Sequence, residues 1–430
     1  MPSSLIVFQG RGQSQMGGTL VKRTQILWGW CIVMALVACW LGCEQATDSR
    51  PAPTAAPGEN TDAPAPDTAA EQAEPAEAAP GVDQAAIDAA NNRVDELRGS
   101  VRKNDRGELI AIDVAANEVP ATNADLELFS KLTSLEQLRV YGAEIDDKGL
   151  PSLKNLTKLK LLWLVNTRIS DEGLVELKDL PELRDLNLRR SEGLTDAGLA
   201  HIKDFPKLQH LHLLYNSLTD AGMEHLAGLN QLLSLDLRGN MGLTDMGLER
   251  LKGLTNLRVL KLRSGMISDM GMEHLKELSN LESLAVEDAQ LVSDTGLEHL
   301  SGLKKLKELT FMRVTGVSDE GIRHLAGLPL KKLDLRGTSV TGAGFETLED
   351  APITDIDLSE TPANDKGMEA LSALEGLESL DLWNSLVTDA GLEHLAKLKK
   401  LKFLRLQGTN VTKDGVENLR KSLPDTEIKA

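Results

Sequence analysis

Eight histidines are the residues of this sequence best suited to binding a metal ion or transferring a proton. Six of them stand directly before a leucine or isoleucine in similar local sequences: His201, His225, His274, His299, His324 and His394. The other two, His210 and His212, lie two residues apart and would share one face of a strand. No carboxylate or cysteine completes with them the ligand set that zinc requires. The histidines therefore predict repeated surface positions and no metal site.

Aspartates that follow serine or threonine form a second recurring pattern. They occur at Asp171, Asp196, Asp220, Asp245, Asp269, Asp294, Asp319 and Asp389. Such a row could hold calcium or supply paired catalytic carboxylates. Each dipeptide, however, precedes an apolar pattern with helical spacing, where the hydroxyl caps the first amides and the carboxylate complements the helix dipole. We interpret the aspartates as helix caps within single units, and Gly342 and Lys413 break the row.

Sequence patterns of known catalytic sites are absent. The sequence has no G-x-x-x-x-G-K-[ST] phosphate loop, no G-x-S-x-G and no H-E-x-x-H. It therefore predicts a protein that is not an enzyme and has no cofactor.

These residues all belong to a segment that repeats itself about every 24 residues, which is typical of stacked repeat architectures. We count thirteen units, opening at Leu109, Leu135, Leu159, Leu183, Leu208, Leu232, Leu257, Leu281, Leu306, Leu330, Ile353, Leu377 and Leu401. In each unit L-x-x-L-x-L has the period of a strand, and the following G-L-x-x-L-x-x-L has the spacing of a helix.

The consensus L-x-x-L-x-L-x-x-[NTS]-x-[LVI]-[TS]-D-x-G-[LM]-x-x-L resembles the leucine-rich repeat of the T-D-x-G-L type, as in bacterial secreted proteins and lipoproteins and in F-box proteins. The resemblance implies an α/β fold, a right-handed β/α solenoid bent into a horseshoe. The chain has no F-box, and its repeats lack the cysteine of the F-box proteins. A ubiquitin-ligase substrate adaptor is therefore only the last of the functional alternatives.

The side chains between the strand leucines would form the concave face of this horseshoe. We expect binding residues there because aromatic residues and arginine are enriched at binding hot spots. The candidates are Tyr141, Trp163, Arg189, Tyr215, Arg238, Lys261, Arg263, Arg336, Trp383 and Phe403. Tyr141, Leu161, Trp163 and Val165 are expected to form an exposed apolar patch. For Arg238 and Arg263 two interpretations stay open: local pairing with Asp236 and Glu287, or contact with an anionic partner.

The N-terminal region has the composition of an export signal. Residues 1–43 contain Lys22 and Arg23 before an apolar run, which predicts a signal peptide with a lipobox, lipidated at Cys39 or alternatively at Cys43. An uncleaved membrane helix is the other interpretation. Met16 is a second candidate start.

The rest of the chain is predicted to have four parts. Residues 44–81 are rich in proline, alanine and glutamate and predict a disordered linker. Residues 82–108 predict a helix-hairpin cap, 109–417 the repeats and 418–430 a C-terminal cap.

The net charge of −18 argues against nucleic acid as a partner. The sequence thus favours a monomeric, lipid-anchored protein outside the cytoplasm, periplasmic or on the cell surface, which binds a protein partner. The alternative is a structural envelope scaffold or a polysaccharide-binding surface protein.

Overall fold

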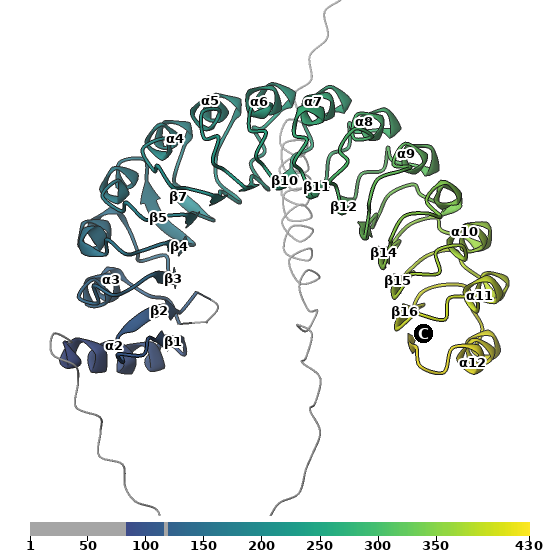
Figure 1. Cartoon of the computed structure of the whole chain (residues 1–430), viewed down its shortest axis with the longest axis horizontal. Coiled ribbons are helices and arrows are strands. Elements are labelled where there is room, and N and C mark those ends of the chain that lie inside the picture. Colours follow the sequence, from purple (N-terminus) through teal and green to yellow (C-terminus); the bar gives the residue numbers. More distant parts are fainter. Residues whose placement is uncertain (1–82, 116–118) are drawn as a thin grey trace, which may run out of the picture. The chain divides into compact units, whose positions relative to one another are not determined.

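The computed structural model describes residues 83–115 and 119–430. These belong to one compact unit, Pro75–Ala430. Its strands line the inner side of an arc and its helices form the outer side (Figure 1). The predicted signal peptide with Cys39 and Cys43, the second candidate start and the linker lie outside the described residues. Within the described residues, no helix has the length and apolar character needed to span a bilayer.

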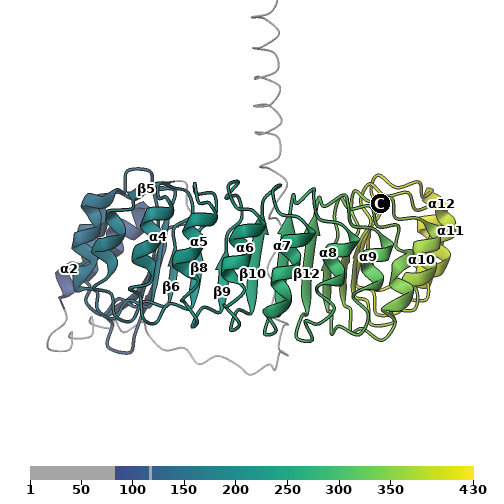
Figure 2. The same ribbon diagram turned by 90° about the horizontal axis from the view of Figure 1, so that it is seen from above.

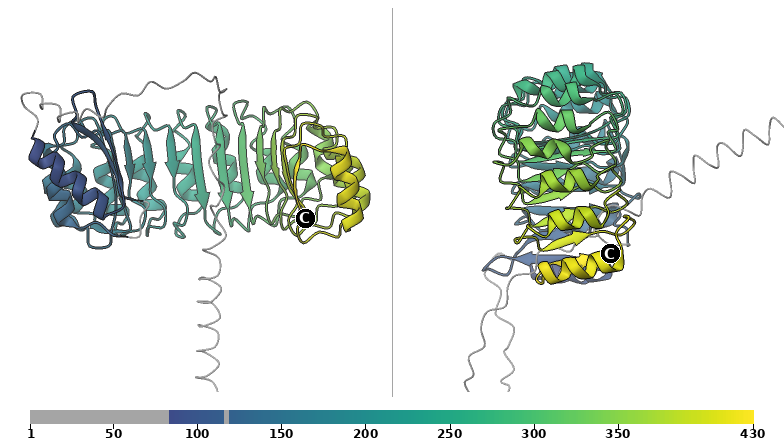
Figure 3. Two further views of the ribbon diagram at one scale, coloured as in Figure 1. Left: turned by 90° about the horizontal axis from the view of Figure 1, so that it is seen from below. Right: turned by 90° about the vertical axis from the view of Figure 1, so that its right-hand side faces the viewer.

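The main sheet has fifteen strands, and they run side by side across the inner face (Figure 3). All neighbours are parallel except β1 and β2. The strands are β1 (Ser100–Lys103), β2 (Leu109–Asp113), β3 (Gln137–Tyr141), β4 (Leu161–Val165), β6 (Asp185–Asn187), β8 (His210–His212), β9 (Ser234–Asp236), β10 (Val259–Arg263), β11 (Ser283–Glu287), β12 (Glu308–Met312), β13 (Lys332–Asp334), β14 (Asp355–Asp357), β15 (Ser379–Asp381), β16 (Phe403–Arg405) and β17 (Glu427–Lys429). β5 (Thr167–Ser170) and β7 (Ser191–Gly193) pair separately.

Most of the helices are short because each belongs to a single repeat of about 24 residues, which it shares with a strand and two loops. The α-helices are α2 (Gln84–Glu96), α3 (Asn123–Phe129), α4 (Asp196–Ile202), α5 (Asp220–Leu226), α6 (Asp245–Leu251), α7 (Asp269–His274), α8 (Asp294–Glu298), α9 (Asp319–Arg323), α10 (Asp365–Leu371), α11 (Asp389–Leu395) and α12 (Lys413–Ser422). Four segments are 3₁₀ helices: η1 (Asp147–Asn155), η2 (Gly173–Leu177), η3 (Leu275–Glu277) and η4 (Ala343–Thr347). η1 contains Pro151, whose missing amide hydrogen disfavours a regular α-helix.

The core is a continuous stack of leucines between the sheet and the helices. In the repeat that contains β8, Leu208, Leu211 and Leu213 are fully buried from the strand side, and Leu226 is fully buried from α5. The same positions are buried in the neighbouring repeats, so the hydrophobic effect acts along the whole arc. The structure thus confirms the predicted α/β solenoid.

The aspartates after the N-cap residues join neighbouring repeats, which corrects the prediction that each acts within its own unit. Asp245 accepts hydrogen bonds from the backbone N and the Oγ of Ser268, at 2.8 and 2.6 Å. Asp171 binds Thr195 in the same way, at 2.8 and 2.6 Å. The carboxylate is ideal for this because both oxygens accept and the N-cap residue supplies two donors.

The glycine of the T-D-x-G motif leaves space for the same aspartate. A Cβ on Gly271 would stand 2.3 Å from Oδ1 of Asp245, and a Cβ on Gly198 would stand 2.3 Å from Oδ1 of Asp171. Any larger residue would push the carboxylate out of its position. Threonine or serine, aspartate and glycine therefore recur together because they make one contact between repeats.

Candidate functional site

The predicted binding residues lie on the inner strands or directly after them. In β3, β4 and β10 every second residue is buried, and the residues between are half-buried on the concave side. The parallel register places Arg139, Trp163 and Asn187 side by side, and His212 follows Asn187. Strand alternation and register together therefore turn residues from distant repeats into neighbours.

Trp163 is the centre of the first cluster on this face. The guanidinium of Arg139 lies 4.5 Å from the centre of its ring, and the ring of His212 meets it edge-on at 6.2 Å between ring centres. Its indole N–H donates to Asp185 at 3.0 Å. Burial lowers the pKa of His212, although Asp185 and Asp236 act in the opposite direction, and this favours the neutral imidazole.

The apolar patch predicted around Trp163 is half-buried and not exposed. Tyr141, Leu161, Trp163 and Val165 are all intermediate in exposure. Arg139 covers the ring of Trp163 and Asp185 accepts a hydrogen bond from its indole N–H, so this surface is an aromatic–arginine pair and not an open apolar patch.

Tyr215 is the centre of the second cluster. It follows β8 in a left-handed conformation with φ at 55°. Its ring crosses Gly239 of the next repeat, where a Cβ would stand 2.4 Å from Cδ1 of the ring. Nη1 of Arg263 donates a hydrogen bond to the hydroxyl of Tyr215 at 2.9 Å. The guanidinium groups of Arg189 and Arg190 lie 5.5 and 5.1 Å from its ring centre.

Trp383 and Phe403 form a third cluster near the C-terminal end of the sheet. Arg336 and Arg405 place their guanidinium groups 5.6 and 5.1 Å from the Trp383 ring centre. The ammonium of Lys429 lies 5.2 Å from the ring centre of Phe403. Nε of Arg336 is buried without a hydrogen-bond partner among the described atoms.

The Nε atoms of Arg139 and Arg189, in the other two clusters, are likewise buried without a hydrogen-bond partner among the described atoms. Arg139 and Arg336 are also paired with Asp113 and Glu360, at 3.0 and 2.9 Å, so an ion pair and a ring together hold each of them, whereas Arg189 contacts the ring of Tyr215.

Arg238 connects repeats, as the interpretation of local pairing predicts. Its Nη2 lies 2.9 Å from Asp236, and its Nη1 lies 3.0 Å from Glu287, two strands away. Burial opposes the charge of Arg238, but Asp236 and Glu287 outweigh this and raise its pKa. Arg263 pairs with Asp288 instead, at 2.5 Å. Lys261, by contrast, has no hydrogen-bond or ion-pair partner within the described part of the chain.

No group of three histidine, cysteine, aspartate or glutamate side chains among the described residues could hold a metal ion. Several concave aspartates have structural contacts instead. The side chains of Asp357 and Asp381 accept from the backbone N two residues later, each at 2.9 Å. This bond satisfies an amide just beyond the end of each short strand.

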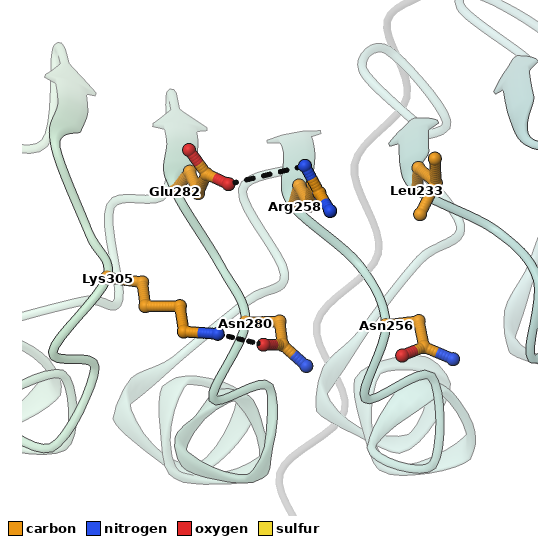
Figure 4. Close-up of a pocket in the computed structure, with 6 residues that line it drawn as sticks. All are labelled: Leu233, Asn256, Arg258, Asn280, Glu282 and Lys305. Carbon is orange, nitrogen blue, oxygen red and sulfur yellow. Dashed lines mark hydrogen bonds and ion pairs between the residues drawn. The ribbon is translucent and has the colours of Figure 1, made fainter.

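A shallow pocket lies on the flank of the solenoid where the strands begin (Figure 4). Leu233, Asn256, Arg258, Asn280, Glu282 and Lys305 line it. Asn280 donates to the carbonyl of Thr255 at 2.8 Å and accepts from Lys305 at 2.6 Å. The carboxylate of Glu282 pairs with Lys307 at 2.5 Å. These polar groups link adjacent repeats.

The sequence interpretation missed an exposed apolar surface on the flank where the helices begin. We call it the methionine flank, and it comprises Met241, Met246, Met266, Met270 and Leu291. These side chains are between 56% and 71% exposed. A sequence signal existed: Met246 and Met270 occupy the variable position of T-D-x-G or S-D-x-G, where other repeats carry alanine, threonine or glutamate.

Comparisons with known proteins agree with the architecture. A family model described as leucine rich repeat matches residues 181–241. A leucine-rich repeat protein from Leptospira interrogans shares 22% identity over 71% of this chain and 80% of its own, with a TM-score of 0.52. A search of curated proteins found no match.

Two further structures align with lower TM-scores. An internalin from Listeria monocytogenes shares 21% identity over 80% of this chain and 94% of its own, at 0.45. A plant peptide hormone receptor, RGFR1 in complex with RGF2, shares 18% identity over 76% of this chain and about half (51%) of its own, at 0.43. Residues 181–241 thus match the leucine rich repeat model, and the described chain shares the fold of the Leptospira protein.

Proposed function

We propose that this chain is a non-enzymatic interaction module that binds a protein partner on its concave strand face. The observation that supports this most strongly is the set of three aromatic rings, Trp163, Tyr215 and Trp383, each stacked with arginines from other repeats. Tryptophan, tyrosine and arginine carry much of the binding energy at protein interfaces.

The stacks favour binding because they are already ordered. Arg139, Arg189 and Arg336 are held against rings before any partner arrives, so little side-chain entropy is lost on association. The rings are half-buried, which leaves part of each for a partner. The clusters lie on different repeats of one inner face, so an elongated protein surface fits them better than a small molecule does.

Lys261 adds a charge preference to this face. Its ammonium has no paired carboxylate among the described residues, whereas Arg238 and Arg263 are each paired with carboxylates. A carboxylate on the partner would therefore be attracted to Lys261 at little cost to internal contacts. We accordingly propose that the partner presents acidic side chains to the middle of the concave face.

Site-specific photocrosslinking from Lys261 in cells that express the chain natively tests this function. Glu393, an exposed residue of α11, is the matched control on the helix side. One discrete adduct from position 261 and none from position 393 is the expected result. Equal adducts from both positions, or a smear from both as a polysaccharide or scaffold would give, would refute a concave protein-binding site.

We also propose that the module is held at the cell envelope, outside the cytoplasm, by a lipid on Cys39, with Cys43 as the alternative. The support is the basic and apolar pattern of residues 22–43. Metabolic labelling with an alkyne-bearing fatty acid should label the wild-type chain and fail to label Cys39→Ala. Labelling that survives in Cys39→Ala but is lost in Cys43→Ala would move the site to Cys43. Labelling that survives both substitutions would refute a lipid at either cysteine.

A further inference from the structure

The methionine flank contains most of the large apolar side chains that the described residues leave exposed. Among the described residues, seven large hydrophobic side chains are exposed. Five of them are Met241, Met246, Met266, Met270 and Leu291. The other two are Val101, in β1, and Leu386, in a distant repeat. Contiguous apolar surface of this kind marks interaction sites on soluble proteins.

The five side chains come from three consecutive repeats. Met246 and Met270 are the second residues of α6 and α7. Met241, Met266 and Leu291 stand in the loops that lead into α6, α7 and α8. A bridge between Ser268 and Leu291 ties two of these loops together. Figure 2 shows the three helices in adjacent positions along the arc. The five residues therefore form one surface.

Folding does not require apolar residues at these positions. Ala221, Thr295 and Glu320 occupy the slot of Met246 and Met270 in other repeats, next to the same threonine–aspartate or serine–aspartate cap. The buried methionines of the region, Met223 and Met272, are separate residues on the core side. The exposed methionines therefore do not contribute to the core, and exposed apolar side chains grouped in this way are typical of a binding surface.

The first turns of α6, α7 and α8 bring carboxylates to the edge of the methionine flank. The stretches 239–249, 264–275 and 289–303 contain no lysine or arginine, and their acidic residues are Asp245, Glu249, Asp269, Glu273, Asp294 and Glu298. Two of these are paired with lysines that follow in the chain, Glu249 with Lys252 at 3.3 Å and Glu273 with Lys276 at 2.8 Å. Asp245, Asp269 and Asp294 accept hydrogen bonds from the next repeat and remain partly exposed, with no cation paired to them among the described residues. The surface is therefore apolar in its middle and negative along its edge.

We infer that the methionine flank is a second interaction surface, which binds an amphipathic peptide segment carrying apolar side chains and lysine or arginine. Methionine side chains are flexible and polarizable, so they adapt to apolar groups of different shape. The carboxylates attract the basic residues of the same segment. This surface lies outside the concave face and is independent of the function proposed above.

A peptide titration with the full-length chain tests the inference. The probe is a fluorescein-labelled helical peptide of fourteen leucine and lysine residues, followed by fluorescence anisotropy. The variant Met246→Ala/Met266→Ser/Met270→Ala copies residue types that other repeats carry at equivalent positions, such as Ala221 and Ser217. We expect this variant to bind the peptide at least about tenfold more weakly than wild type, which corresponds to about 1.4 kcal/mol.

Two controls separate this site from general attraction to an acidic protein. A peptide in which serine replaces leucine keeps the charge and should not bind. Leu386→Ser, at an exposed apolar residue in the position of Met266 but in a distant repeat, should leave binding unchanged. Equal affinity of wild type and the methionine variant, or no binding to wild type, would overturn the inference. Sedimentation of wild type as a dimer that the methionine variant abolishes would assign the flank to a second copy instead. Unchanged thermal unfolding of the variant shows that its fold is intact.

Discussion

Replacing Arg238 tests whether this arginine holds the solenoid together or waits for a partner. The guanidinium is 27% exposed, whereas the carboxylates of Asp236 and Glu287 are 5% and 7% exposed. Arg238→Ala would leave two buried carboxylates without their cation. Arg189, in the equivalent position two repeats earlier, is the matched control because its contact is the ring of Tyr215 and not a carboxylate.

The expected loss follows from the burial of these carboxylates. Removing one partner of a buried ion pair typically costs about 3 to 5 kcal/mol, because a desolvated charge remains. Partial exposure of the guanidinium lets water reach the site, so we expect a loss of about 2 to 4 kcal/mol for Arg238→Ala. Arg189→Ala removes a cation–π contact and should cost about 0.5 to 1 kcal/mol. Adding Glu287→Leu to Arg238→Ala should restore part of the loss.

Urea unfolding of the full-length chain, followed by circular dichroism, measures these free energies. The slope of the free energy against urea must stay constant for the comparison to hold. Equal losses for Arg238→Ala and Arg189→Ala would refute the assignment of Arg238 to structure. Such a result would favour Arg238 as a residue reserved for an anionic partner.

Three other outcomes are expected. Asp245→Ala should lower the free energy of unfolding by about 2 to 3 kcal/mol, because two charge-assisted hydrogen bonds between repeats are lost; Asp414→Ala should cost less in the same urea titration, since Asp414 occupies the variable position of its motif and its side chain makes no hydrogen bond to another repeat among the described residues. Gly239→Ala should displace the Tyr215 ring, which tyrosine fluorescence quenching by acrylamide would detect as greater access. Burial raises the pKa of Asp381, so the carboxyl group adds stability at pH values below its usual pKa and loses this as the pH rises through the raised value. In Asp381→Asn the free energy of unfolding should therefore fall less steeply with rising pH above about pH 4 than it does in wild type.

The spacing of leucines made the architecture predictable. Leu211 and Leu213 alternate with outward-facing residues, and only one orientation of the strand removes both from water. The contact made by Asp171 was not predictable in the same way. A threonine or serine followed by aspartate is a sufficient helix cap on its own, and the bond to Thr195 exists only once two repeats have stacked.

In the candidate site, too, local sequence patterns predicted some features, whereas others depend on how the repeats pack together. Strand alternation indicated that Trp163 and Lys261 face away from the core, which is how the structure places them. It could not show that the Tyr215 ring crosses Gly239, because that depends on a left-handed backbone after the strand. The exposure of Met270 also depends on the stack, since the sequence alone does not distinguish a solvent-facing methionine from one in the core.

The exceptions to the aspartate pattern show that the contact between repeats, and not the cap alone, determines these residues. Where Asn123 stands in place of aspartate, the following N-cap residue is Asp146, and the amide of Asn123 donates to its carboxylate at 2.7 Å. Donor and acceptor have exchanged sides, because serine or threonine donates to aspartate elsewhere. Where Gly342 supplies no side chain, the following N-cap residue is Asn364, which binds the amides of its own helix and donates its backbone N–H to the carbonyl of Thr341 at 3.2 Å. Each change in one repeat is thus matched by a change in the next, as a bond between the two repeats requires and an isolated helix cap does not.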